Sequence, residues 1–415
     1  MTGRGVVSVS SAGLGNDFRR YWAGASASLI GSEITTFLLP VIAAATLGAS
    51  PVEMSLLVAA GIVPNLAAPL FAGPLVDRGS KRRLLLATDF ARAALLAMVV
   101  ALWAADLLGI GTLILAALAL GLCSVVADVG YVAWVPALVP SDALTKANGR
   151  LEASRSVSQV AGPGLGGLLL QLVSAPLALL LDVASYLFSA WTLLLIKVAE
   201  AVPDRASTGA GAYVRQVAEG FAGVTRIPAV RLLAIGSGGF NFFAGAAGSI
   251  AVLFVLRTLE VSPTVYGIAL GLGAVGGVVG ASVANRAQTR FGVRIALSSA
   301  LALAGAGELI LALSPEGPWV PVVFLFTAQL VASLAITVYL VLGITMRQHA
   351  IPKPMIGRVF ASMRVISRGP MLVGALMGGW LAEATSLRTV LIVAATGQVL
   401  VGLGVILARR SFPER

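Results

Sequence analysis

Long apolar stretches alternate with short polar segments along almost the whole chain of 415 residues. Each stretch has about 20 residues or more, which is the length that an α-helix needs to cross the hydrocarbon core of a membrane. Helices are expected because lipid offers backbone polar groups no other partner. The pattern predicts twelve spans, at residues 18–47, 52–76, 84–105, 112–139, 151–173, 177–198, 230–256, 265–284, 293–313, 320–346, 359–381 and 389–408.

The spans form two groups of six, and short landmarks repeat between the groups. Asp77-Arg78 recurs as Asn285-Arg286, and Gly149-Arg150 recurs as Gly357-Arg358 at the same spacing of 208 residues. A fixed spacing of this kind indicates a parallel duplication with two pseudo-symmetric halves. The predicted domains are an N-terminal tail, a first six-helix half, a central loop, a second half and a C-terminal tail, at residues 1–17, 18–198, 199–228, 229–408 and 409–415.

The central loop contains apolar residues on one helical face at 213–225, which predicts an amphipathic helix along the membrane interface. An ordinary linker helix fits the same pattern.

Composition agrees with a polytopic membrane protein. Hydrophobic residues make up 58% of the chain and charged residues 11%, whereas soluble domains carry about 25% charged residues. The net charge of +11 does not indicate nucleic acid, because the cations gather in alternate loops and at span ends. Of 29 lysines and arginines, Arg257 and Arg388 alone fall in the predicted outer loops. This asymmetry predicts cytoplasmic termini and a cell (inner) membrane location.

Enzyme chemistry is not indicated. The chain has no phosphate-binding loop of the G-x-x-x-x-G-K-(S/T) form, no metal-ligand cluster and no nucleophile–base pair. No cofactor or metal is therefore expected, and the lone Cys123 forms no intrachain disulfide.

Carboxylates inside predicted spans are costly, so they are candidates for function. Glu33 lies at the middle of the first span and Asp128 in the fourth, and either could exchange a proton for a substrate. For Asp128 a structural salt bridge with Arg92 or Arg364 is the alternative. Two other embedded acids, Asp182 and Glu308, are weaker candidates, and Asp182 fits a structural cap or hydrogen-bonded group.

The substrate path is expected to be mostly apolar with a few polar groups. Its candidate lining residues are Phe37, Tyr131, Phe240, Asn241, Gln329 and Tyr339. For each of them, packing or lipid contact is the alternative. No cluster of cations lies in mid-span, so a lipophilic neutral or cationic substrate is favoured over a dianion.

The segment Gly73-Pro-Leu-Val-Asp77-Arg78-Gly79-Ser-Lys-Arg82-Arg83 resembles the signature loop between spans 2 and 3 of the major facilitator superfamily of transporters. The resemblance implies the all-α major facilitator fold, with twelve helices in two six-helix halves. It also implies a conformational latch at Gly73, Asp77, Arg78 and Arg82, in which the acid meets the positive end of the helix that begins near Gly357. Charge used for topology alone is the alternative.

The fifth span carries Gly162-Pro163-x-x-Gly166-Gly167, which resembles the antiporter motif of the same superfamily. Proline kinks the helix and glycines allow close helix approach. The earlier glycine positions of the motif are Ser154 and Ser158 here. A packing kink unrelated to transport direction is the alternative.

Further phrases resemble the twelve-span drug and siderophore efflux branch, which includes enterobactin and macrolide exporters. They are residues 18–22, 87–92, 135–140 with 147–148, and 181–186. This resemblance implies a monomeric, proton-coupled multidrug antiporter whose partners are protons, a small-molecule substrate and membrane lipid. The arginine that many proton-coupled branches carry in span 4 is missing, which shifts weight to Glu33 and Asp128. A proton-independent facilitator or uptake permease is the alternative, and a receptor-like binding protein a more distant one.

Overall fold

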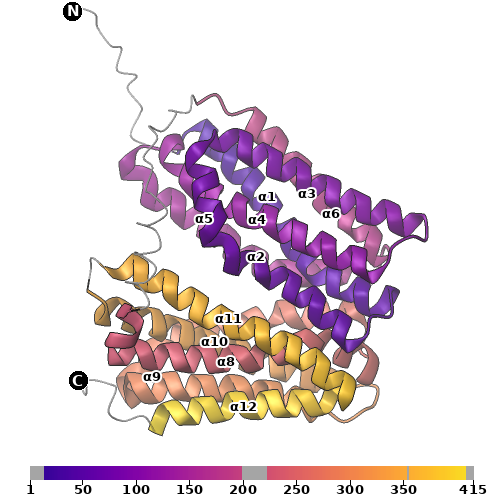
Figure 1. Ribbon diagram of the computed structural model, residues 1–415, viewed down its shortest axis with the longest axis vertical. Helices are drawn as coiled ribbons and strands as arrows, with labels where there is room; N and C mark the ends of the chain where they lie inside the picture. Colours follow the sequence, from indigo (N-terminus) through magenta and orange to yellow (C-terminus); the bar gives the residue numbers. More distant parts are fainter. Residues whose placement is uncertain (1–13, 199–221, 353–354, 408–415) are drawn as a thin grey trace, which may run out of the picture.

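The computed structural model describes residues 14–198, 222–352 and 355–407, with the backbone alone at residues 68–78, 356–358, 361 and 364. The described part contains helices and no strand (Figure 1). The amphipathic helix predicted at 213–225 lies almost entirely outside the described residues. The helices of the first half are α1 (Asn16–Val41), η1 (Ile42–Thr46), α2 (Pro51–Arg78), α3 (Lys81–Ala104), α4 (Ile110–Leu138), η2 (Ser141–Ala143), α5 (Leu144–Leu169) and α6 (Ala175–Leu194). The helices of the second half are α8 (Pro228–Leu253), η3 (Phe254–Thr258), α9 (Pro263–Ala312), α10 (Val320–Ala350), α11 (Ile356–Ala384) and α12 (Leu387–Leu407).

Serine caps fix where several helices begin. At the start of α2, the Ser50 side chain accepts from the Glu53 backbone N–H, and the Glu53 carboxylate accepts from the Ser50 N–H. This reciprocal pair satisfies two of the donors that a helix start leaves free. Ser80 caps α3 and Ser262 caps α9 through single bonds to the backbone three residues on. The spans therefore begin sharply after tight turns.

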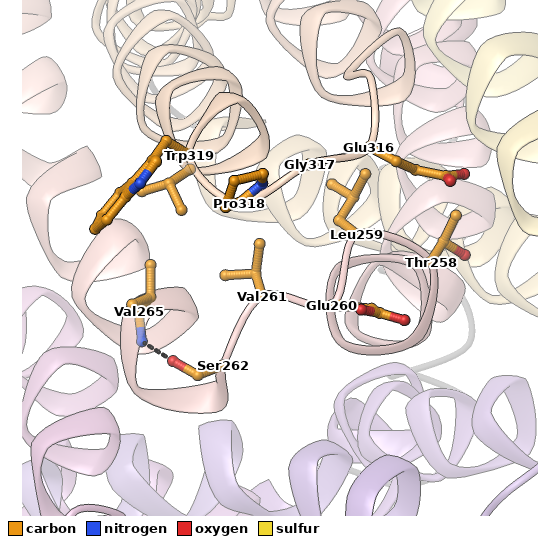
Figure 2. A pocket seen from close by; sticks show the side chains of 11 residues that line it. Thr258, Leu259, Glu260, Val261, Ser262, Val265, Glu316, Gly317, Pro318 and Trp319 are labelled. Carbon is orange, nitrogen blue, oxygen red and sulfur yellow. Dashed lines mark hydrogen bonds between the residues drawn. The ribbon is translucent and has the colours of Figure 1, made fainter.

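The 50-residue helix α9 is a hairpin of two spans. A straight helix of that length would place its ends about 75 Å apart. Instead, residues 258–265 at its start and 316–322 beyond its end line one pocket of about 580 Å³ (Figure 2). Gly292 makes the reversal with φ of 77°, a left-handed conformation that glycine adopts without strain. The two separate spans predicted at 265–284 and 293–313 are confirmed.

The membrane-spanning set agrees with twelve helices. Nine described helical segments are long and apolar enough to cross a membrane, and one of these is α9 with its two spans. α2 contributes an apolar stretch at Pro51–Ala67. α5, with 26 residues, is the twelfth helix and has the length of a span. The protein is thus an all-α polytopic membrane protein built from two six-helix halves, which Figure 1 shows as an indigo-to-magenta bundle and an orange-to-yellow bundle.

The two ends of the molecule differ in how the halves meet. We call the side with the α1–α2 turn (47–50) and the α8–α9 turn (259–262) the closed side. The opposite side, with the α2–α3 turn (79–80) and the α9 hairpin bend (285–294), is the basic side. On the closed side one apolar core joins both halves, for example Ile34 with Ile250.

On the basic side each half has its own core. Phe18 and Trp134 belong to the cluster of the first half, and Val230 and Leu297 to that of the second. Among the described side chains, the halves therefore share a core on the closed side and have separate cores on the basic side, and in Figure 1 the two bundles diverge toward the left of the view.

Candidate functional site

The seam between α1 and α5 brings together residues that the sequence analysis singled out for different reasons. A Cβ added at Gly162 would collide with the Cβ of Glu33, and one added at Gly166 would lie 2.7 Å from the Phe37 ring. Glu33 and Phe37 are four residues apart on α1, as are Gly162 and Gly166 on α5, so the two pairs stack along the seam. The kink motif therefore forms the surface on which the Glu33 segment rests.

Hydrogen bonds close the same seam nearer the basic side. The hydroxyl of Ser154 receives hydrogen bonds from the Trp22 indole N–H at 2.9 Å and from the Ser26 hydroxyl at 2.8 Å. Serine at this motif position thus holds α1 through its hydroxyl.

A charged pair lies beside Glu33. Arg155 of α5 donates to the Asp128 carboxylate of α4 at 3.3 Å, and the side chains are 40% and 51% exposed. Both charges act on Glu33, Arg155 by attraction and Asp128 by repulsion. Within the described part of the chain, the half-buried Glu33 carboxylate has no hydrogen bond or ion pair of its own. The two acids predicted as coupling groups are thus electrostatic neighbours, with Arg155 as their shared cation.

Arg155 was not among the predicted site residues. The fifth span was predicted to begin at residue 151, which placed Arg155 at a helix end, but α5 begins at Leu144. Arg155 therefore lies three turns inside the helix. Asp128 does form an ion pair, but with Arg155 and not with Arg92, which pairs with Asp89. The side chain of Arg364, the other cation considered for Asp128, lies outside the described residues.

A second polar group is sealed inside the first half. Asp182 of α6 is fully buried and accepts hydrogen bonds from Thr35 of α1 at 2.5 Å and from Ser185 at 2.7 Å. The expectation that Asp182 is a hydrogen-bonded structural group is confirmed. A Cβ at Gly31 would collide with this carboxylate, so α1 and α6 are locked at close range.

The buried ion pair of α3 lies next to that group. Arg92 donates to Asp89 at 2.5 Å, as their spacing of three residues predicts, and the Arg92 guanidinium stacks 4.3 Å from the Tyr186 ring centre. Tyr131, predicted as path lining, hydrogen-bonds with Ser189 of α6 at 3.0 Å and belongs to this interior.

The predicted lining residues of the second half lie among packed helices. Phe240 and Tyr339 belong to its buried apolar core, and Asn241 donates to the Ser237 carbonyl one turn back on α8. Gln329 packs on Gly273 between α9 and α10. The half-buried Glu308 receives a hydrogen bond from Gln398 of α12 at 2.7 Å. The described contacts of these residues therefore lie within the second half.

Backbone contacts shut the closed side. A Cβ at Gly267 of α9 would lie 2.5 Å from the Pro163 carbonyl oxygen of α5, so the two helices touch across the halves. Phe37 and Tyr266 face each other across the same boundary with ring centres 6.0 Å apart. Between α11 and α2, a Cβ at Gly379 would collide with Ser55. Phe37 thus lies at the contact between the two halves on the closed side.

The predicted latch falls largely outside the described side chains. Gly73, Asp77 and Arg78 are helical at the end of α2, but the side chains of Asp77 and Arg78 lie outside the described residues, as does that of Arg358. Arg82 is described: its guanidinium donates to the carbonyls of Leu193 and Leu194 at the end of α6, at 3.0 and 2.7 Å. Arg82 therefore ties α3 to α6 within the first half.

Sequence comparisons match nearly the whole chain to transporters. A family model described as transmembrane secretion effector matches residues 11–414. A Bacillus subtilis relative, named as an uncharacterized MFS-type transporter YvqJ, is 24% identical over 66% of this chain and 65% of its own length. The chain thus spans just under two thirds of that relative. The multidrug efflux pump Tap of Mycolicibacterium fortuitum is 26% identical over 85% of this chain and 86% of its own length.

Solved structures share the fold. The nucleoside transporter NupG superposes with a TM-score of 0.75 at 12% identity, covering 95% of this chain and 100% of that one. A bacterial homologue of the iron transporter ferroportin, in an inward-facing state, gives 0.73 at 16% identity, covering 94% and 98%. At these identities the likeness concerns the fold alone.

Proposed function

Because the chain belongs to the transmembrane secretion effector family of the major facilitator superfamily, we propose that it exports lipophilic small molecules in exchange for protons. The fold of two helical halves is that of an alternating-access transporter. The relative named as a multidrug efflux pump supports drugs or natural products as the substrate class.

One observation carries the proton coupling. Glu33 is an embedded carboxylate that lacks a described hydrogen-bond partner and lies beside the Asp128–Arg155 pair. Arg155 and Asp128 are 40% and 51% exposed, and in this proposal that exposure is to water in the space between the halves. A carboxylate that water reaches from one side can take up or release a proton there, and an embedded charge without a function would be costly.

The α1–α5 seam offers the mechanical link. Gly162 lies directly on Glu33, and Gly167 lies on α9 of the other half. A change in charge at Glu33 therefore acts on α5, which also contacts the other half. A ligand or proton shifts a conformational equilibrium only through such a difference between states.

The substrate follows from the charges near the path. The described residues of the first half offer two acids and one arginine there. A neutral or cationic lipophilic molecule fits this balance better than an anion. We place the basic side in the cytoplasm, where cations accumulate, and the present state is then open to the cytoplasm. The Gly73–Arg78 segment with Arg82 is proposed as the latch that shuts this side later in the cycle, in a monomeric transporter of the cell membrane.

Inside-out vesicles loaded with a pH-sensitive dye test the proposal. A proton gradient is imposed, and lipophilic antibiotics and siderophores are added to wild type, Glu33→Gln and Asp128→Asn. We expect a compound to dissipate the gradient in wild type and an acid-to-amide change to abolish the response. Glu53→Gln, at the α2 cap on the closed side, is the matched control and should respond like wild type.

A second outcome points to the alternative activity. If compounds move down their own gradients equally well in wild type and both variants, proton coupling is wrong and the protein is a facilitator.

A further inference from the structure

The two halves carry the same unusual turn on the closed side. η1 and η3 are five-residue π-helical segments that lie 212 residues apart. Each is followed by a left-handed residue at the same spacing, Gly48 with φ of 67° and Glu260 with φ of 52°. π-helical turns are rare and are frequent at functional sites. Their occurrence at equivalent positions of both halves indicates that these turns have a functional role.

The turns end in matching backbone bonds. In the first half the Ala49 N–H donates to the Ala43 carbonyl at 2.8 Å, and in the second the Val261 N–H donates to the Val255 carbonyl at 3.0 Å. Among the backbone bonds described at the first turn, none uses the carbonyls of Ala44 or Ala49. Both residues are buried, so these two oxygens need a donor from elsewhere.

Arg257 of the second half supplies both donors. Its Nη1 donates to the Ala49 carbonyl and its Nη2 to the Ala44 carbonyl, each at 2.8 Å. Hydrogen bonds from a guanidinium are stronger than neutral ones, and its fork fixes their direction. The equivalent position of the first half is Ala45, which has no donor to return. The contact between the two turns is therefore one-sided and crosses from one half to the other.

The other arginine of the predicted outer loops makes a different contact. Arg388 donates to the carbonyls of Ala312 and Ser314 at 3.1 and 2.7 Å, and it stacks 5.3 Å from the Phe254 ring centre. All of these partners belong to the second half. Arg388 therefore stiffens one half, whereas Arg257 joins two.

A pocket beside the end of η3 leaves room for the residues after Arg257 to move. The pocket of about 580 Å³ has Thr258 to Val265 as one wall and Glu316 to Val322 as the other (Figure 2). Close-packed interiors resist displacement, but an open pocket beside a turn does not. Residues from Thr258 onward can therefore shift toward this pocket, whereas Phe254 and Val255 at the start of η3 are buried in the core that joins the halves.

We propose that Arg257 stabilises the state in which the closed side is shut. Its two hydrogen bonds hold the two π-turns together while the basic side is open, and they break when the closed side opens. The inference rests on the alternating-access part of the proposed function and is independent of substrate and proton coupling. Losing two hydrogen bonds from a charged group shifts the ratio of closed to open by about tenfold or more.

Distance measurements between spin labels, in purified protein in nanodiscs, test this role of Arg257. The labels are placed at Leu107→Cys and Glu383→Cys, exposed positions at the closed-side ends of the two halves, in a Cys123→Ser background. We expect Arg257→Gln to raise the population at long distance by about tenfold. Arg257→Lys, with a single ammonium group in place of the fork, should give an intermediate shift. Arg388→Gln is the matched control and should leave the distribution unchanged.

Two results would overturn the proposed role of Arg257. One is an Arg257→Gln distribution equal to the parent. The other is an equal shift in Arg388→Gln, which would mean that any loosening of the second half opens the closed side. Because the experiment uses no substrate and no proton gradient, failure of the proposed role of Arg257 and failure of proton-coupled export remain distinguishable.

Discussion

Glu33 occupies the space that a side chain at Gly162 would need, so the central carboxylate of α1 and the first glycine of the α5 kink are in direct contact. The glycine does more than permit a bend. It allows the α5 backbone to approach the Glu33 segment within contact distance, and Gly167 makes a similar approach to α9 five residues later. One short stretch of α5 thus touches the candidate coupling residue and the opposite half of the protein.

The first prediction separates this contact from the kink itself. Gly162→Ala forces a methyl group into Glu33, and overpacking of this kind costs about 1–3 kcal/mol. We expect slower transport and a lower melting temperature in detergent. Gly164→Ala is the matched control, because a Cβ there meets no atom within 4 Å. Alanine at that position should gain up to about 1 kcal/mol of helix propensity. Equal losses in both variants would show that the motif acts through flexibility and not through contact with Glu33.

The second prediction concerns Arg155. Asp128 and Arg155 are 51% and 40% exposed, so removal of this pair should change stability by no more than about 1 kcal/mol. Arg155→Gln also removes the positive charge that faces Glu33, so we expect the vesicle dye response to fall while the melting temperature stays near wild type. Arg155→Lys keeps the charge and should restore part of the response. A large drop in melting temperature with unchanged transport per folded molecule would assign Arg155 a structural role.

The third prediction addresses the buried pair of α3. Arg92 and Asp89 are 4% and 0% exposed, and removing one partner leaves a buried charge, at a cost of about 3–5 kcal/mol. Arg92→Gln should therefore be strongly destabilised. The double variant Asp89→Asn/Arg92→Gln should lose less than the sum of the two single changes, because no unpaired charge remains. Thermal unfolding of the four proteins gives the coupling, and additive losses would contradict a mutual interaction.

The twelve spans and the two halves could be predicted from the sequence, because lipid imposes length and apolarity on each helix separately. The start of α5 could not, since its first two turns are polar: Leu144 begins the helix but the apolar pattern starts at Leu151. That error concealed Arg155. Arg155 was counted as a cation at an inward span end, whereas the structure places it three turns inside α5, in an ion pair with Asp128.

Contacts between helices were beyond the pattern as well. Glu33 and Gly162 were each recognised, one by its charge and one by a motif, yet neither signal says that they touch. The repeat spacing shows a similar limit. It is 208 residues on the basic side, between Asp77 and Asn285, and 212 on the closed side, between Ser50 and Ser262. The second half therefore lacks about one helical turn between these points, and the π-turns were not expected because a single extra residue per turn leaves no apolar signature.

The last prediction tests how the closed side shuts. A Cβ at Gly267 would lie 2.5 Å from the Pro163 carbonyl oxygen, whereas one at Gly271 would lie 3.2 Å from the Val160 carbonyl oxygen. An alanine at Gly267 therefore forces the backbone of α5 or α9 to move. An alanine at Gly271 requires a shift of only a few tenths of an ångström. We expect Gly267→Ala to hold the halves apart on the closed side and to raise the long-distance population between labels at Leu107→Cys and Glu383→Cys. Gly271→Ala should do so more weakly. A larger effect at Gly271, or none at either position, would mean that α5 and α9 do not set the closing distance.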